Sequence, residues 1–188
     1  TISTVREAGG NNIVSLSKAS HKALNRRSVV EKRLLLALDQ RNLDVYYQPL
    51  IDTASKKVIA MEALVRWHDE EIGTVTPDEL IPIAEETGLI SEIGMFMLEK
   101  ACLQAVEWHT QGHDLKVSIN SSIREFRGKN VAKTMLEIIE RTGCPTTSIH
   151  LEITEKFALE AESETSIMAQ MRTLEQAGIS FILDDFGT

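Results

Sequence analysis

Apolar runs that end in a side-chain oxygen recur along this chain, and they constrain its fold more than any other feature. Asn120, Glu152 and Asp184 each close such a run, and they are spaced 32 residues apart. A period of about 30 residues fits one strand and one crossover helix, so the strands are expected to be parallel. The carboxyl ends of parallel strands meet at one edge, where α/β barrels carry their active sites. The runs are Val58–Glu62, Val117–Asn120, Ile149–Glu155 and Ile179–Asp185.

The segment from Leu43 to Trp67 is typical of a β-hairpin. Asp44–Leu50 is rich in β-forming residues, and Val58–Trp67 is the expected return strand after a polar turn. Helical patterns separate the later strands, which predicts an α/β fold: an incomplete (β/α)8 TIM-like barrel with an antiparallel first strand and about five of its eight strands. The apolar strand Ile179–Leu183 would be an open edge, so we expect the chain to be cut short.

Residues 17–42 predict a linker helix that leads into the barrel. The helical pattern runs from Ser17 to Gln40, and Ser28 with Glu31 matches a capping box. The apolar stripe expected on this helix consists of Val30, Leu34, Leu35 and Leu38.

Composition and charge argue against several function classes. The net charge is −8, and the only basic cluster is Asn25-Arg26-Arg27, so binding to DNA through a cationic face is not expected. No stretch approaches a membrane span or a secretory leader. This segment is therefore expected in the cytoplasm without membrane contact, and an upstream anchor stays open. Cys102 and Cys144 predict reduced structural thiols.

Glu62, Asn120, Glu152, Asp184 and Asp185 form a set of hard oxygen ligands from four strands. Such sets suit Mg²⁺, Mn²⁺ or Ca²⁺ rather than a structural Zn²⁺. Two ions bridged by an aspartate would clamp a phosphodiester and activate water. Neighbouring strand residues point to opposite faces, so Asp185 has to lie beyond the strand end to share a centre with Asp184.

Plainer interpretations exist for each of these acids. A single strand-end carboxylate is usually a helix cap or an ion-pair partner, and only the repetition over four strands favours a joint site. Glu155 fits equally well as an acid at a helix start, where it interacts with the helix dipole, and as a residue of the site. The chain has no P-loop, GxGxxG or GxSxG motif. Its histidines do not match HExxH, so a catalytic histidine is not expected.

Five segments, in order, resemble the EAL-domain family of cyclic di-GMP phosphodiesterases. The resemblance covers about Leu43 to Thr188. Five motifs with family-like gaps are far more specific than Glu-Ala-Leu alone. The segments are Tyr47-Gln48-Pro49, Glu62-Ala63-Leu64-Val65-Arg66-Trp67, Ser118-Ile119-Asn120-Ser121-Ser122, Leu151-Glu152-Ile153-Thr154-Glu155 and Asp184-Asp185-Phe186-Gly187-Thr188.

The resemblance implies a two-metal site in a modified (β/α)8 barrel with one antiparallel strand. A first Mg²⁺ or Mn²⁺ would be bound by Glu62, Asn120, Glu152 and Asp184, with Asp185 bridging to a second. The reaction would be hydrolysis of cyclic di-GMP to linear pGpG in bacterial second-messenger signalling. Glu62, Asp184 and Asp185 would be the catalytic groups.

The resemblance also implies roles outside the metal set. Gln48, Leu64 and Arg66 would line the ligand site, with the Arg66 guanidinium on a phosphate. Glu155 would support the loop after Asp185. Cyclic di-GMP is the expected partner. A noncatalytic cyclic di-GMP sensor is the alternative; such domains usually lose a metal ligand, and none is lost up to Thr188.

The family continues past the Asp-Asp-Phe-Gly-Thr motif with a lysine, a glutamate and a glutamine, for which this chain has no residues. We therefore expect 43–188 to be the N-terminal part of an EAL domain, and the isolated chain to hydrolyse poorly. Residues 1–16 form the expected remnant of a preceding GGDEF domain, because Arg6–Leu16 resembles the tail of such a diguanylate cyclase domain. The GGDEF signature is missing, so no cyclase activity is expected. An upstream GGDEF or sensory domain is an expected partner, and a homodimer stays open.

Overall fold

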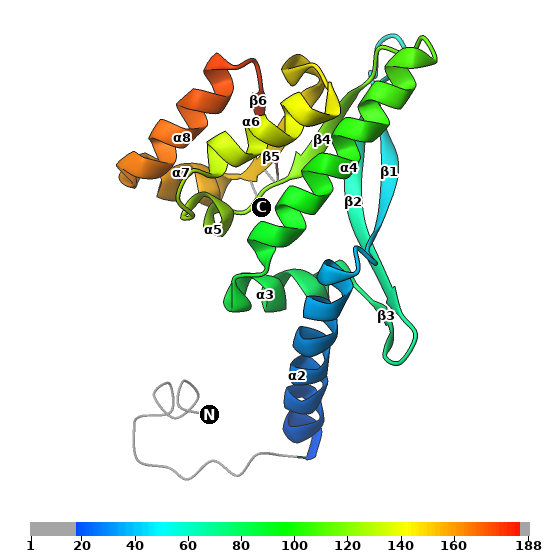
Figure 1. The fold of residues 1–188 in the computed structure, drawn as a ribbon, viewed down its shortest axis with the longest axis vertical. Helices are drawn as coiled ribbons and strands as arrows, with labels where there is room; N and C mark the ends of the chain where they lie inside the picture. The colour runs from blue at the N-terminus through cyan, green and yellow to red at the C-terminus, as the bar shows by residue number, and fades with distance from the viewer. Residues whose placement is uncertain (1–17, 185–188) are drawn as a thin grey trace.

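An open sheet with helices packed against one face makes up this computed structural model, which describes residues 18–184 (Figure 1). The strands are β1 (Asp44–Ile51), β2 (Val58–Asp69), β3 (Gly73–Val75), β4 (Lys116–Asn120), β5 (Ile149–Thr154) and β6 (Ser180–Asp184). The helices are α2 (Lys18–Asp39), α3 (Pro77–Thr87), α4 (Ile90–Thr110), α5 (Ile123–Phe126), α6 (Val131–Thr142), the 3₁₀ turn η1 (Thr146–Ser148), α7 (Glu155–Ser163) and α8 (Thr165–Gln176).

The order of the strands confirms the predicted α/β fold with an antiparallel first strand. The sheet runs β1-β2-β4-β5-β6. β1 is antiparallel to β2, whereas β2, β4, β5 and β6 are parallel and joined by helical crossovers. The short β3 was not predicted; it pairs with the end of β2 from Trp67 to Asp69.

The two faces of the sheet differ, as the period of two along a strand requires. Under the helices, Trp67, Ile119 and Leu151 are only 2–3% exposed. This face and the apolar sides of the helices form the core. α4 buries a stripe of Ile93, Met97, Ala101 and Ala105, and Cys102 and Cys144 are buried, free thiols. The ligands predicted from the sequence lie on the opposite face.

α2 confirms the helix predicted between Ser17 and Gln40, but two details of that prediction are wrong. Ser28 and Glu31 lie inside a helix that already begins at Lys18, so they do not cap it. Leu35 is 51% exposed and lies off the buried stripe, whereas Val30 and Leu34 are fully buried. The stripe instead continues to the buried Ala37.

Two arginines of α2 attach the helix to the sheet and to α3. Arg26 donates to both carboxylate oxygens of Glu79 on α3, at 2.8 and 3.0 Å. Arg33 donates to the buried carboxylate of Asp69 at the end of β2, at 2.9 Å. Thr76-Pro77-Asp78-Glu79 has the pattern of a capping box, but Thr76 makes no capping hydrogen bond, and the Glu79 carboxylate accepts from Arg26.

Several expectations concern parts of the chain that the structure does not describe. The Arg6–Leu16 segment and the predicted ligand Asp185 lie outside the described residues. The domain boundaries and the linking role of α2 stay predictions. Among the described helices, none is both long and apolar enough to cross a lipid bilayer.

Replacing Leu34 with alanine is expected to lower the free energy of unfolding by about 2–5 kcal/mol, because a fully buried leucine leaves a cavity. The matched control is Leu35→Ala on the exposed side of the same helix, which should change stability by less than about 0.5 kcal/mol. Urea denaturation measures both variants. Equal effects would contradict the docking of α2.

Candidate metal and ligand site

Four of the predicted ligands project from one face of the sheet. Asn120 and Asp184 end β4 and β6, Glu152 lies two residues before the end of β5, and Glu62 lies within β2, which continues to Asp69. Asn120 lies beside Glu152 in the register of β4 and β5, and Asp184 lies beside Thr154 at the end of β5. Glu62 on β2 lies beside the residue two positions before Asn120. Paired residues of neighbouring strands point to the same face, so Glu62, Asn120, Glu152 and Asp184 all point away from the helices.

A direct contact joins two of these side chains. The Asn120 Nδ2 group donates a hydrogen bond to Glu62 Oε1 at 2.8 Å, although the two residues are 58 positions apart. The backbone N–H of Ser121 donates to the Glu152 carbonyl at 2.9 Å, which ties the end of β4 to β5. The structure thus brings β2, β4 and β5 together at the predicted position.

Electrostatics mark Glu152 as a crowded carboxylate. Its side chain is buried, and burial is the main cause that raises its pKa above the ordinary glutamate value. The Ser118 hydroxyl lowers the pKa of Glu152, although the buried Ser118 oxygen makes no hydrogen bond of acceptable geometry. The carboxylates of Glu62 and Asp184 raise the pKa further. These acids are therefore close enough to repel one another.

The residues present suit a divalent cation. Three carboxylates and an amide supply only hard oxygen donors, which Mg²⁺ and Mn²⁺ prefer. Among residues 18–184, no three Asp, Glu, His or Cys side chains meet closely enough to hold an ion by themselves. The predicted set also needs the Asn120 amide and Asp185, which lies outside the described residues.

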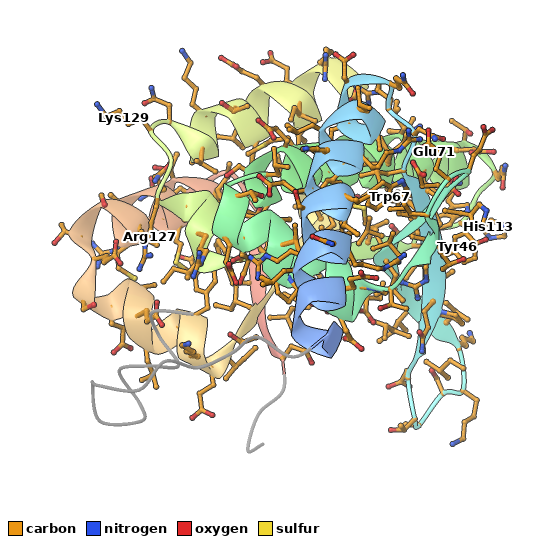
Figure 2. All side chains as sticks on the ribbon, turned by 90° about the horizontal axis from the view of Figure 1, so that it is seen from below. Tyr46, Trp67, Glu71, His113, Arg127 and Lys129 are labelled. Atoms are coloured by element: carbon orange, nitrogen blue, oxygen red, sulfur yellow. The ribbon has the colours of Figure 1, made fainter. Side chains whose placement is uncertain are left out.

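A groove of about 800 Å³ is lined by one of the four ligands, Asn120, and opens next to the ends of β4 and β5. Leu64, Arg66 and Asn120 line it on the sheet side, and it extends between α3, α5 and α7 toward Arg127. Tyr46 and Arg127 lie toward opposite sides of the view in Figure 2. The groove is large enough for a small-molecule ligand.

Arg66 is held in place on the sheet side of the groove. Its guanidinium donates to the Val65 carbonyl at 2.8 Å and lies over the Tyr46 ring, 5.9 Å from the centroid. Gln48 lies beside Glu62 in the β1–β2 register and is exposed on the same face. The three predicted ligand-binding residues, Gln48, Leu64 and Arg66, therefore share the face of the metal ligands.

Glu155 is the first residue of α7. The Thr154 hydroxyl caps this helix by accepting from the Phe157 N–H at 3.2 Å. Glu155 therefore has the position of an acid at a helix start, where the dipole favours a negative charge. Its predicted support of the loop after Asp185 stays a prediction.

Sequence reasoning missed one acid in the wall of the groove. Glu125 on α5 is 2% exposed and accepts from the Ser122 N–H at 2.9 Å. Burial raises the pKa of its carboxyl to about 8. The signal was present, because Ser122-Ile123-Arg124-Glu125 fits a capping box. α5 has only four residues, however, and shows no helical periodicity.

Comparisons with known proteins point to one family. The profile described as "EAL domain" matches residues 31–188. The oxygen sensor protein DosP of Escherichia coli (strain K12) is 33% identical over 185 residues, which cover 98% of this chain and 23% of DosP. The bifunctional diguanylate cyclase/cyclic di-GMP phosphodiesterase MucR of Pseudomonas aeruginosa is 33% identical over 154 residues, which cover 81% of this chain and 22% of MucR.

A solved structure agrees with the profile. The "PaMucR Phosphodiesterase, c-di-GMP complex" superposes with a TM-score of 0.78 and 31% identity, covering 85% of this chain and 64% of that one. The chain spans less than a quarter of the length of DosP and MucR.

Proposed function

This chain belongs to the EAL domain family, and we propose that it is the part of a cyclic di-GMP phosphodiesterase that carries the first metal ligands. The observation that carries the proposal is the contact between Asn120 and Glu62 at 2.8 Å, on the face that also presents Glu152 and Asp184. The matched relatives include a protein named as a cyclic di-GMP phosphodiesterase, which supports the substrate.

We propose that Glu62, Asn120, Glu152 and Asp184 hold a first Mg²⁺ or Mn²⁺ and that Asp185 bridges to a second. The oxygen donors and the crowding of their charges support this assignment. When bound, such ions would activate a water molecule and neutralise phosphate charge. Attack of water on phosphorus would break one phosphate–sugar P–O bond and give linear pGpG.

The ligand would lie against the face that carries these acids and reach the groove at Leu64, Arg66 and Asn120. Arg66 would bind a phosphate oxygen, because a guanidinium fork fits two oxygens at once and its contacts to Val65 and Tyr46 already restrict it. Gln48 and Leu64 would position the nucleotide from the same face, and Glu155 would support the loop after Asp185. These residues would hold the phosphodiester in line with the attacking water.

We also propose how the wider protein is organised. Residues 43–188 would be part of an EAL domain, residues 17–42 a linker helix, and residues 1–16 the remnant of a GGDEF domain. Cyclic di-GMP would be the ligand, an upstream GGDEF or sensory domain would regulate it, and a homodimer would be one assembly. The site would work in the cytoplasm.

Replacing Arg66 with lysine is expected to weaken binding of cyclic di-GMP by about 10- to 100-fold, because lysine keeps the charge but loses the paired donors. Calorimetric titration in Ca²⁺ measures the change. The control is Arg141→Lys on α6, where the side chain pairs with Glu99 outside this groove. Wild-type affinity in Arg66→Lys would contradict the assigned role.

The proposed activity is tested by incubating the complete gene product with cyclic di-GMP and Mg²⁺ or Mn²⁺ and separating the nucleotides. We expect linear pGpG as the product and no turnover after chelation with EDTA. Tight binding that survives EDTA, with no hydrolysis in any metal, would contradict the proposal and favour a sensor.

A further inference from the structure

The loop after β4 is fastened by one buried carboxyl. Glu125 Oε1 accepts from the Ser122 N–H at 2.9 Å, and Glu125 Oε2 lies 3.4 Å from the Ser121 hydroxyl, which donates to it. The Ser122 hydroxyl in turn accepts from the Arg124 N–H at 3.3 Å and completes a capping box. Both residues that follow Asn120 are thus held by the same side chain.

The position of this carboxyl depends on a glycine of α4. A Cβ added at Gly94 would lie 2.3 Å from Glu125 Oε2 and 2.8 Å from its carboxyl carbon. Only glycine lets the helix approach so closely, because real Cβ atoms do not come this near to other atoms. Gly94 and Glu125 therefore form one unit, in which α4 supports the loop that follows Asn120.

Glu85 on α3 also contacts the loop after β4. The Ser122 hydroxyl donates to Glu85 Oε1 at 2.5 Å, and Arg124 donates to the Glu85 carbonyl at 2.9 Å. α5 has four residues and is too short to be stable alone. The loop therefore takes its conformation from Glu125 and Glu85 rather than from its own helix.

From these contacts we propose that Glu125 is a positioning residue that orients Asn120 toward the metal site. The chain from Asn120 to Ser122 is fixed on one side by the Ser121 N–H bond to the Glu152 carbonyl, at 2.9 Å, and on the other by Glu125. Without the carboxyl, the end of β4 frays and the Asn120 amide loses its fixed contact with Glu62. The proposal rests on the metal site under the proposed function.

The test compares Glu125→Ala, which removes both loop contacts, with Glu125→Gln, which keeps the shape, one oxygen acceptor for the Ser122 N–H and an amide N–H that can donate to the Ser121 hydroxyl. Electron paramagnetic resonance measures the Mn²⁺ affinity of the complete gene product. We expect Glu125→Ala to weaken Mn²⁺ binding by about 10- to 100-fold, as removal of a group that orients a metal ligand does. Glu125→Gln should stay within about threefold of the wild type, because its amide can still bond both Ser121 and Ser122.

A second measurement needs no metal. Hydrogen exchange of the metal-free protein should show faster exchange at Ser121 and Ser122 in Glu125→Ala and wild-type exchange in Glu125→Gln. Gly94→Ala should behave like Glu125→Ala by displacing the carboxyl, and should add little in the Glu125→Ala background, where the space is free. If Glu125→Ala does not fold, Ser121→Ala removes one contact and should weaken Mn²⁺ binding about fivefold.

The outcomes separate this proposal from the proposed function. Wild-type Mn²⁺ affinity and wild-type hydrogen exchange in Glu125→Ala would overturn the positioning role of Glu125. An equal loss of Mn²⁺ affinity in Glu125→Gln would also overturn it. A wild-type protein that binds Mn²⁺ but does not hydrolyse cyclic di-GMP would overturn the function and leave the positioning role standing. A wild-type protein that binds no Mn²⁺ would overturn both.

Discussion

Replacing Glu62 with glutamine is expected to lower kcat for cyclic di-GMP hydrolysis by about 1000-fold or more, because metal-ion catalysis contributes several kcal/mol. The glutamine keeps the length of the side chain, and its oxygen can still accept the hydrogen bond that Asn120 donates at 2.8 Å. It removes the negative charge that binds a cation. The loss should therefore be chemical rather than structural.

Nucleotide separation at saturating Mg²⁺ or Mn²⁺ measures the effect, and thermal unfolding checks the fold. The matched control is Glu140→Gln on the exposed outer side of α6, which should leave kcat unchanged. A Glu62→Gln variant that keeps more than a tenth of the wild-type rate would remove Glu62 from the metal set. A large loss in both variants would point to a general charge effect.

Replacing Glu125 with glutamine is expected to change how stability depends on pH. Burial raises the pKa of this carboxyl from 4.5 to about 8, and the nearby Glu85 charge adds to the shift. Between these two values the unfolded chain has released the proton and the folded chain has kept it. The wild type therefore loses stability as pH rises from about 4.5 to about 8, by of the order of 4 kcal/mol.

The glutamine variant lacks this titration, so its stability relative to the wild type should rise by that amount between pH 5 and pH 8.5. Urea denaturation at a series of pH values measures the difference. Glu137→Gln, on the exposed side of α6, should follow the wild-type profile. If the difference between Glu125→Gln and the wild type stayed constant with pH, the carboxyl would not be titrating from a buried position.

The ligand face was predictable because two simple rules act on the same residues. Alternation along a strand and the spacing of 32 residues place Asn120, Glu152 and Asp184 on one face at one edge. The antiparallel hairpin that carries Glu62 was predictable from β-forming residues on both sides of a polar turn. Neither rule depends on side chains far away in the sequence.

The parts that were not predictable depend on tertiary contacts. Ser28 and Glu31 have the pattern of a helix start, yet they lie inside a helix that begins at Lys18. The same helix is held by contacts distant in sequence, from Arg26 to Glu79 and from Arg33 to Asp69. A helix start at Glu155 was one of the two interpretations of that acid, and α7 begins there, but its nine residues were not predicted as a separate helix because no glycine divides α7 from α8. The short β3 exists only through its pairing with β2.

Glu125 shows the same limit inside the site. Its box pattern was visible in the sequence, but its importance arises from the close approach of Gly94, which lies 31 residues earlier on α4. Local sequence patterns cannot reveal which glycine will lie against which carboxyl. A buried acid in the wall of a groove is found only once the helices are packed.

Anomalous diffraction from a crystal of the complete gene product soaked in Mn²⁺ tests the central claim most directly. We expect a strong Mn²⁺ peak on the face of β2, β4, β5 and β6 that points away from the helices, with oxygen ligands from Glu62, Asn120, Glu152 and Asp184. A Mn²⁺ ion bound elsewhere, or no peak at this face at saturating Mn²⁺, would contradict it.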